Sequence, residues 1–137
     1  MSFVLDNSVA LAWCFEDEQT PATLALLEEV GEAGALAPIL WPLEALNGLL
    51  VAERRGRLDA NRRRLLAGFL SELPVKLDEE TADRVWTDIS HLAERFHLSS
   101  YDAAYLELAQ RHQLPLASLD QDLRKAAAAL KLKVLGQ

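Results

Sequence analysis

Four acidic residues occupy positions from which their carboxylates could meet in the folded protein: Asp6, Glu44, Asp102 and Asp120. Asp6 and Asp120 each stand at the end of a short apolar run of strand length, just before a helical segment. Glu44 and Asp102 each fall in the first turn of an expected helix. In an open parallel sheet, ligands bind at the edge where strands end and helices begin. We therefore expect these four carboxylates, from four separate segments, to converge at that edge.

This convergence predicts a divalent metal site. Several like charges in water-poor surroundings are strongly unfavourable unless a cation neutralises them. An all-oxygen set without Cys or His selects a hard ion, Mg²⁺ or alternatively Mn²⁺. Such an ion can polarise a phosphoryl oxygen, orient or deprotonate a water, and stabilise a leaving 3′ oxygen without a protein nucleophile. The pattern therefore indicates hydrolysis of a phosphodiester.

Each acid also has a purely structural interpretation. Four aspartates are at positions where a helix cap or a first-turn carboxylate is favoured by free backbone N–H groups and the helix dipole: Asp6, Asp102, Asp120 and Asp122. Glu44 is open to the same interpretation. The four acids taken together favour a metal site, because residues that only cap helices have no reason to follow strands repeatedly at the same edge of the sheet. Three polar neighbours could either form local hydrogen bonds or contact the site: Ser8, Asn47 and Ser118.

The elements that must position these residues follow from the spacing of apolar side chains. Runs of strand length are Ser2–Leu5, Ala35–Ala37, Val75–Leu77, Leu116–Ser118 and Val134–Leu135. Helical spacing extends over Val9–Phe15, Pro21–Val30, Pro42–Arg55, Ala60–Leu70, Ala82–Phe96, Asp102–Arg111 and Asp122–Leu130. Strands that alternate with helices predict an α/β fold, with a mostly parallel central sheet of about five strands flanked by helices.

Local signals place several helix ends. Pro21 and Pro42 suit the first helical position, and Gly56 can close the helix that begins at Pro42. Ser99 lies three residues before Asp102, in an arrangement similar to a capping box. These signals place Glu44 and Asp102 near helix N-termini.

The bulk composition predicts one folded domain over residues 1–137. That length supports one hydrophobic core, and half of the residues are apolar. No uncharged apolar run reaches membrane length, and the start of the chain lacks the layout of a secretory signal. We therefore expect a cytoplasmic protein with no membrane partner. The lone Cys14 cannot form an internal disulfide.

The net charge of -7 opposes nucleic-acid binding overall, because affinity for phosphates comes chiefly from Lys and Arg. Charge placement reduces this objection, since six arginines lie in one short stretch: Arg54, Arg55, Arg57, Arg62, Arg63 and Arg64. Such a stretch is typical of a solvated helix end and turn, and the alternative is a track for RNA. The acidic bias also suits a basic protein partner.

Four stretches carry a resemblance to a known family: Val4–Ser8, Pro42–Asn47, Leu98–Ala109 and Leu116–Leu123. They occur in the family's order and extend over nearly the whole chain. On these stretches the sequence resembles the PIN-domain ribonucleases, specifically the VapC-type toxins of bacterial and archaeal toxin–antitoxin pairs. The sequence departs from the family's pattern at two positions: Asn7 replaces a commoner small hydroxyl residue, and Ser118 replaces the usual Thr. Both changes leave the acids intact and affect only the detailed geometry of the site.

The resemblance implies a function, a ligand set and partners. It implies a single PIN-like domain that acts as a metal-dependent endoribonuclease, the toxin of a type II toxin–antitoxin system. The implied metal ligands are Asp6, Glu44, Asp102 and Asp120, with Asp122 as an auxiliary ligand. The implied partners are RNA as substrate, a cognate VapB-type antitoxin that covers the active-site groove, and a second copy of the chain in a homodimer.

Two other functions stay open from the sequence. A phosphatase of similar architecture would phosphorylate a strand-end Asp, but the segment Asp6–Val9 lacks the second Asp that haloacid-type phosphatases carry two residues further on. A catalytically silent PIN-like binding or regulatory module would keep the acids without cutting RNA. The RNA target is not specified by any motif, because single-stranded loops are recognised by shape and stacking.

Overall fold

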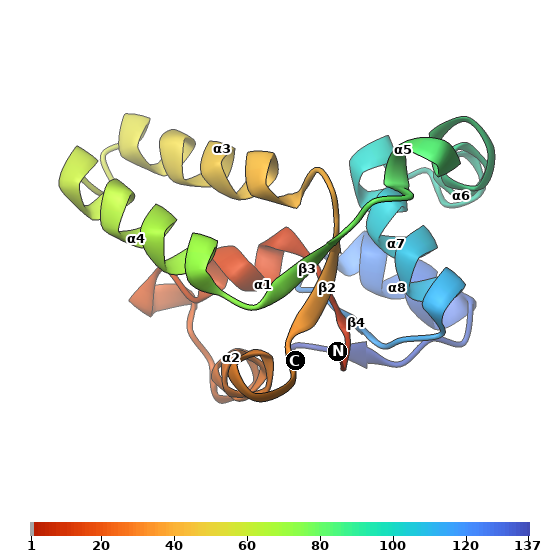
Figure 1. Cartoon of the computed structure of the whole chain (residues 1–137), viewed down its shortest axis with the longest axis horizontal. Helices are drawn as coiled ribbons and strands as arrows, with labels where there is room; N and C mark the ends of the chain where they lie inside the picture. The colour runs from red at the N-terminus through yellow and green to blue at the C-terminus, as the bar shows by residue number, and fades with distance from the viewer. Residues whose placement is uncertain (1) are drawn as a thin grey trace.

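A five-stranded parallel sheet forms the centre of the computed structural model, which describes residues 2–137 (Figure 1). The strand order is β3-β2-β1-β4-β5, and Val4 of β1 pairs with Leu36 on one side and Leu116 on the other. The strands are short and the inner ones are fully apolar, as expected for a sheet covered on both faces. Their bounds are β1 Val4–Leu5, β2 Ala35–Pro38, β3 Val75–Asp78, β4 Leu116–Ala117 and β5 Val134–Leu135.

Helices connect the strands and cover the two faces of the sheet. Figure 1 shows the helices before β3 on one side of the strands and those after β3 on the other, as right-handed crossovers require. The first group is α1 Asn7–Ala12, α2 Pro21–Ala33, α3 Trp41–Arg54 and α4 Ala60–Glu72, with a 3₁₀ turn η1 at Glu16–Glu18. The second group is α5 Thr81–Arg84, the π-helical segment η2 Val85–Ile89, α6 Ser90–Phe96, α7 Ser100–His112 and α8 Gln121–Ala129.

The core lies where α7 crosses the sheet. Every residue of the segment Ala103–Ala109 is buried, because α7 packs on β1, β2 and β4 and is covered in turn by α6 and α8. Phe3 and the β1 residues Val4 and Leu5 have no exposed surface. Asp102, on the first turn of α7, is therefore held by a helix that has little freedom to move.

The sequence predicted the architecture correctly, with two local differences. The α/β class, the parallel sheet and all five strands are confirmed, although four strands are shorter or longer by one or two residues. The expected single helix Ala82–Phe96 is instead divided by the π-helical segment η2, whose wider turn has no marker in the sequence. The 3₁₀ turn η1 was also not predicted. None of the helices in residues 2–137 has the length and apolar composition needed to cross a membrane.

The predicted helix ends agree with the structure in most cases. The Ser99 side chain caps α7 by accepting a hydrogen bond from the Asp102 backbone N–H at 3.1 Å. Gly56 follows the end of α3 and adopts a φ of 79°, which favours glycine. Because α3 begins at Trp41, Pro42 is its second residue and not the first. This shift by one position keeps Glu44 in the first turn.

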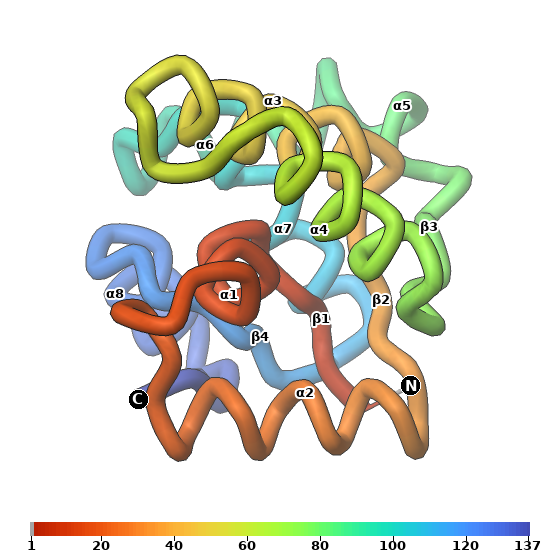
Figure 2. Tube along the Cα trace, turned by 90° about the vertical axis from the view of Figure 1, so that its left-hand side faces the viewer, coloured from red at the N-terminus to blue at the C-terminus, as the bar shows by residue number. Residues whose placement is uncertain are grey.

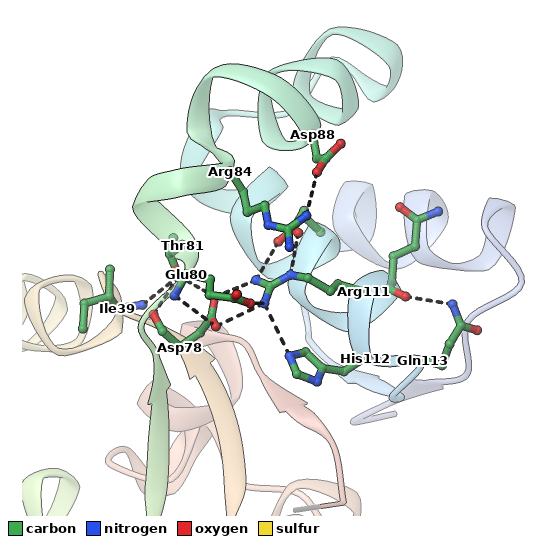
Figure 3. A network of polar contacts seen from close by, with 11 residues as sticks. Ile39, Asp78, Glu80, Thr81, Arg84, Asp88, Arg111, His112 and Gln113 are labelled. Carbon is green, nitrogen blue, oxygen red and sulfur yellow. Dashed lines mark hydrogen bonds and ion pairs between the residues drawn. The ribbon is translucent and has the colours of Figure 1, made fainter.

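A cluster of ion pairs joins the end of β3 to α7 (Figure 3). The Arg111 guanidinium donates to Asp78 Oδ2 at 2.6 Å and to Glu107 Oε1 at 2.8 Å, and all three side chains are largely buried. A third carboxylate, that of Glu80, accepts from Arg111 at 2.8 Å and is exposed. Although burial raises the pKa of Asp78, the hydrogen bonds from Arg111 hold it below its usual range. Arg111 thus neutralises two buried carboxylates at once.

Candidate active site

The site lies where the sheet changes its winding direction. From β1 the chain crosses to β2 on one side, whereas β4 and β5 occupy the other side. Therefore β1 and β4 are neighbours in the sheet although β2 and β3 come between them in the sequence. Crevices at the carboxyl ends of two such strands are the usual ligand sites of open α/β sheets. Asp6 follows β1 directly and Asp120 follows β4, so both carboxylates flank this point.

Asp6 is a buried carboxylate held from two sides. It is 4% exposed, and its Oδ2 accepts hydrogen bonds from Ser8 Oγ at 2.5 Å and Ser118 Oγ at 2.9 Å. Burial raises the pKa of Asp6, while these hydrogen bonds oppose the rise. Because two hydroxyls hold the same oxygen, the carboxylate has a fixed orientation and Oδ1 is left for another ligand.

The two serines also tie the neighbouring segments together. The backbone N–H of Leu119 donates to Ser8 Oγ at 2.9 Å, and that of Asp120 donates to Ser118 Oγ at 3.1 Å. Asp120 in turn caps α8 by accepting from the Leu123 backbone N–H at 2.9 Å. The segment after β4 is therefore fixed against the start of α1, and Asp120 is held near Asp6.

Glu44 reaches the same place from the first turn of α3. Burial raises its pKa to about 7, and the charges of Asp6 and Asp102 add to this rise. Its Oε1 atom is buried and has no hydrogen-bond partner in residues 2–137. A buried carboxylate oxygen without a partner is costly, so this oxygen is available to a donor or a cation.

Asp102 completes the acidic group from the first turn of α7. Burial raises its pKa to about 6, and the charges of Asp6, Asp120 and Asp122 raise it further. Asp122 lies on the first turn of α8 and is exposed, as is Asp120 at the N-cap of the same helix. The raised pKa values of Glu44 and Asp102 show that the carboxylates affect one another electrostatically.

The structure thus brings the predicted acids to one edge of the sheet. Of the two alternatives left open for the polar neighbours, Ser8 and Ser118 both donate to Asp6 Oδ2, whereas Asn47 is exposed on α3 and a role for it toward Glu44 stays a prediction. Within residues 2–137, no three acidic, His or Cys side chains are close enough to hold one ion. Carboxylates brought together without a cation repel one another. Metal ligation by these residues therefore stays a prediction.

The residues present fit a hard divalent cation. Every donor is a carboxylate or hydroxyl oxygen, which is the ligand type of Mg²⁺ and Mn²⁺. The unpartnered Oε1 of Glu44 is a buried atom that a cation would satisfy. Asp6, Glu44, Asp102 and Asp120 would hold the ion, and Asp122 lies near enough to Asp102 to influence it.

Sequence analysis missed one residue of this site, Tyr105. It is fully buried on α7, and its hydroxyl lies close to Glu44 but has no hydrogen bond of good geometry in the described chain. Burial and the charge of Glu44 raise its pKa, so the hydroxyl stays protonated and can donate. A signal was present, because Tyr105 follows Asp102 by three residues and so shares its face of the helix.

Comparison with solved structures supports the same fold over almost the full chain. PAE2754 from Pyrobaculum aerophilum is 25% identical, with a TM-score of 0.69 over 92% of this chain and 86% of its own. FitAcB from Neisseria gonorrhoeae is 17% identical, with a TM-score of 0.65 over 96% and 95%. FitAB bound to an IR36 DNA fragment is 15% identical, with a TM-score of 0.66 over 98% and 94%. The last two show similarity of fold alone. No curated protein matches the sequence.

A family model gives the assignment. The model of the PIN domain matches residues 3–129, which include all four predicted metal ligands and both serines that hold Asp6. The matched segment covers most of the fold, since it begins just before β1 and ends with the last residue of α8. This chain therefore belongs to the PIN domain family.

Proposed function

We propose that this chain is a metal-dependent endoribonuclease and the toxin of a type II toxin–antitoxin pair. PIN domains are generally nucleases and typically use divalent metal ions. The observation that carries the proposal is the acidic group itself. Asp6 is oriented by two hydroxyls, and it faces Glu44 and Asp102, whose pKa values of about 7 and 6 reflect burial and mutual repulsion. Bringing these carboxylates together lowers the stability of the metal-free folded chain near neutral pH, because Glu44 and Asp102 are more readily protonated there than in the unfolded chain.

In the proposed hydrolysis, each of the four acidic side chains has a role in holding the ion or fixing its ligands. A bound divalent ion supplies charge neutralisation at the scissile phosphate and lowers the pKa of an attacking water. Asp6 keeps one orientation because Ser8 and Ser118 hold its Oδ2. Glu44 would contribute a carboxylate ligand from the first turn of α3, where its Oε1 has no partner among residues 2–137. Asp102 on α7 and Asp120 at the N-cap of α8 would contribute further carboxylate ligands to the ion.

The partners follow from the proposed function. We place RNA at the acidic edge, in the cytoplasm, and a co-encoded VapB-type antitoxin over the same edge. FitAB, which shares the fold, is bound to DNA in its structure. An antitoxin segment that brings Arg or Lys to these acids would compete with both the cation and RNA, because one set of carboxylates would serve all three. A homodimer is part of the same proposal.

The first prediction tests the chemistry. Mixed transfer and ribosomal RNA is expected to be cleaved in the presence of Mg²⁺ or Mn²⁺ and to stay intact in excess EDTA, because the acids supply only oxygen ligands. Cleavage is measured by gel electrophoresis of end-labelled RNA, and restoring Mn²⁺ to the chelated sample is the control. Undiminished cleavage in EDTA would exclude the metal mechanism. No cleavage with either ion would favour the catalytically silent module.

A second prediction concerns pH. Glu44 and Asp102 have folded pKa values of about 7 and 6, above their ordinary values of 4.5 and 3.8. At pH values between the ordinary and the folded pKa of each group, the folded state keeps a proton that the unfolded state has released. The free energy of unfolding therefore falls as the pH rises through this interval. The melting temperature of the metal-free protein is expected to decrease by several degrees from about pH 5 to about pH 8.

A variant and an added ion test whether the acidic group causes the pH dependence of the melting temperature. Glu44→Gln removes one of the groups whose pKa is raised, so the melting temperature of this variant should depend less on pH. Saturating Mn²⁺ should oppose the decrease, because the ion binds the deprotonated carboxylates and stabilises the folded state by mass action. A wild-type melting temperature that rises steadily over this interval would contradict the pKa directions.

A further inference from the structure

The arginine-rich stretch forms the far end of the helical hairpin α3–α4. Six of the chain's 14 basic residues lie between positions 54 and 64, in a protein with a net charge of -7. Figure 1 shows α3 and α4 side by side, extending away from the sheet, and Figure 2 shows their connecting turn above α1. The positive charge of the chain is therefore concentrated at one end of the helix that carries Glu44.

Only some of these arginines are neutralised by neighbouring acids. Arg57 pairs with Asp17 at 3.2 Å and with Glu18 at 3.0 Å, and Arg63 pairs with Glu53. The other four are exposed and form no ion pair within residues 2–137: Arg54, Arg55, Arg62 and Arg64. Exposed guanidinium groups without carboxylate partners can bind phosphates in bidentate geometry.

A groove lies between α3 and the end of α1 and reaches one of these arginines, Arg55. Its volume is about 290 Å³, and its lining is mainly apolar, with Leu11, Phe15 and Val51 beside Arg55 and the ion pair of Arg57 with Glu18. Arg55 follows Glu44 by eleven residues, which is about three helical turns, so the two positions share a helix face and lie roughly 16 Å apart along the axis. One face of α3 thus connects the acidic site to the arginines.

Electrostatics determines which ligand fits this surface. The acidic edge repels phosphates, so a nuclease of this charge needs positive groups beside the site to hold its substrate. Single-stranded nucleic acids bind where a basic track accompanies apolar or aromatic groups on which bases can stack. A protein segment that brings a basic residue to the acids would meet arginines of the same sign here. RNA is therefore the better occupant.

We propose that single-stranded RNA runs along α3 from the acidic site, with its backbone phosphates bound by Arg54, Arg55 and Arg64. This inference rests on the proposed ribonuclease function and adds the surface that holds the substrate. The arginines bind phosphate without reading the base, so they set affinity and not sequence preference. Arg54 and Arg55 lie about three helical turns from Glu44, at the other end of α3, and Arg64 lies on α4, so the three arginines take no part in the bond cleavage.

The test compares two triple variants that lose the same charge. The first is Arg54→Gln, Arg55→Gln and Arg64→Gln; the matched control is Lys76→Gln, Arg95→Gln and Lys133→Gln, all exposed and outside the hairpin. Binding of a fluorescein-labelled RNA of about 12 nucleotides is measured by anisotropy in excess EDTA over a series of KCl concentrations. Thermal melting checks the folding of both variants, and the single variant Arg55→Gln replaces the triple if that one is unfolded.

The expected result is a Kd at least about tenfold higher for the hairpin variant, with its salt slope smaller by about 2, since each lost phosphate contact removes roughly 0.7. The control should stay close to wild type. In cleavage assays with Mn²⁺, the hairpin variant should show a raised KM and an unchanged kcat.

The outcomes separate this inference from the proposed function. Cleavage by the wild type with an unchanged Kd and KM in the hairpin variant overturns the arginine track and leaves the nuclease proposal intact. Lost RNA affinity in that variant, without cleavage by any form of the protein, supports the track and contradicts the nuclease proposal. Equal losses in both triple variants, or loss of antitoxin binding with normal RNA binding, also overturn the track.

Discussion

Replacing Asp6 with Asn is expected to reduce RNA cleavage roughly 100-fold or more while the protein stays folded. The amide keeps the shape and can still accept hydrogen bonds from Ser8 and Ser118, which hold the carboxylate in the wild type. It loses the charge that a divalent cation requires. Initial cleavage rates at saturating Mn²⁺ measure the effect, and isothermal titration with Mn²⁺ shows whether the ion still binds.

The same change should leave the metal-free protein at least as stable. Asp6 is buried, and its charge raises the pKa values of Glu44 and Asp102, so removing it relieves repulsion among the remaining acids. A melting temperature equal to or above that of wild type, in EDTA, would separate loss of chemistry from loss of fold. Cells that express the variant without antitoxin should grow, whereas wild type should arrest growth.

Asp122→Asn is the matched control, because Asp122 is exposed at the rim of the same site. Its effect on cleavage should be much smaller than that of Asp6→Asn. Glu44→Gln, Asp102→Asn and Asp120→Asn should behave as Asp6→Asn does. If Asp122 proved essential while Asp120 proved dispensable, the assignment of the ligands after β4 would be wrong.

Arg111→Met is expected to lower the free energy of unfolding by about 3 kcal/mol or more. Arg111 is the only cation that contacts the carboxylates of Asp78 and Glu107 within residues 2–137, and these are 8% and 5% exposed as side chains. Methionine fills similar space but leaves two buried charges without a partner. Urea denaturation at neutral pH measures the change.

Two further variants identify the cause. Arg84→Met breaks the exposed pair with Asp88, so it should cost no more than roughly 0.5 kcal/mol. Adding Asp78→Asn and Glu107→Gln to Arg111→Met should recover part of the loss, because the uncompensated charges are gone. A loss in Arg111→Met that is no greater than in Arg84→Met would show that the buried cluster contributes little to stability.

Sequence patterns alone were enough to predict the local structure around the acids. Asp6 and Asp120 follow apolar runs and cap helices, and Glu44 and Asp102 fall in first turns, all of which depends on residues within about one helical turn. The alternation of strands and helices was likewise sufficient for the parallel sheet. The π-helical segment Val85–Ile89 could not be predicted, because its extra residue per turn leaves no distinct apolar spacing.

The tertiary structure decided how these pieces act together. Ser8 and Ser118 hold the same oxygen of Asp6 only because β1 and β4 are neighbours, and the order of strands is not encoded in either segment. The raised pKa values of Glu44 and Asp102 depend on burial by several elements. The same burial leaves the Tyr105 hydroxyl without a hydrogen-bond partner among residues 2–137. Local sequence sets which groups are present, whereas desolvation and charge coupling depend on distances between segments that meet only in the folded chain.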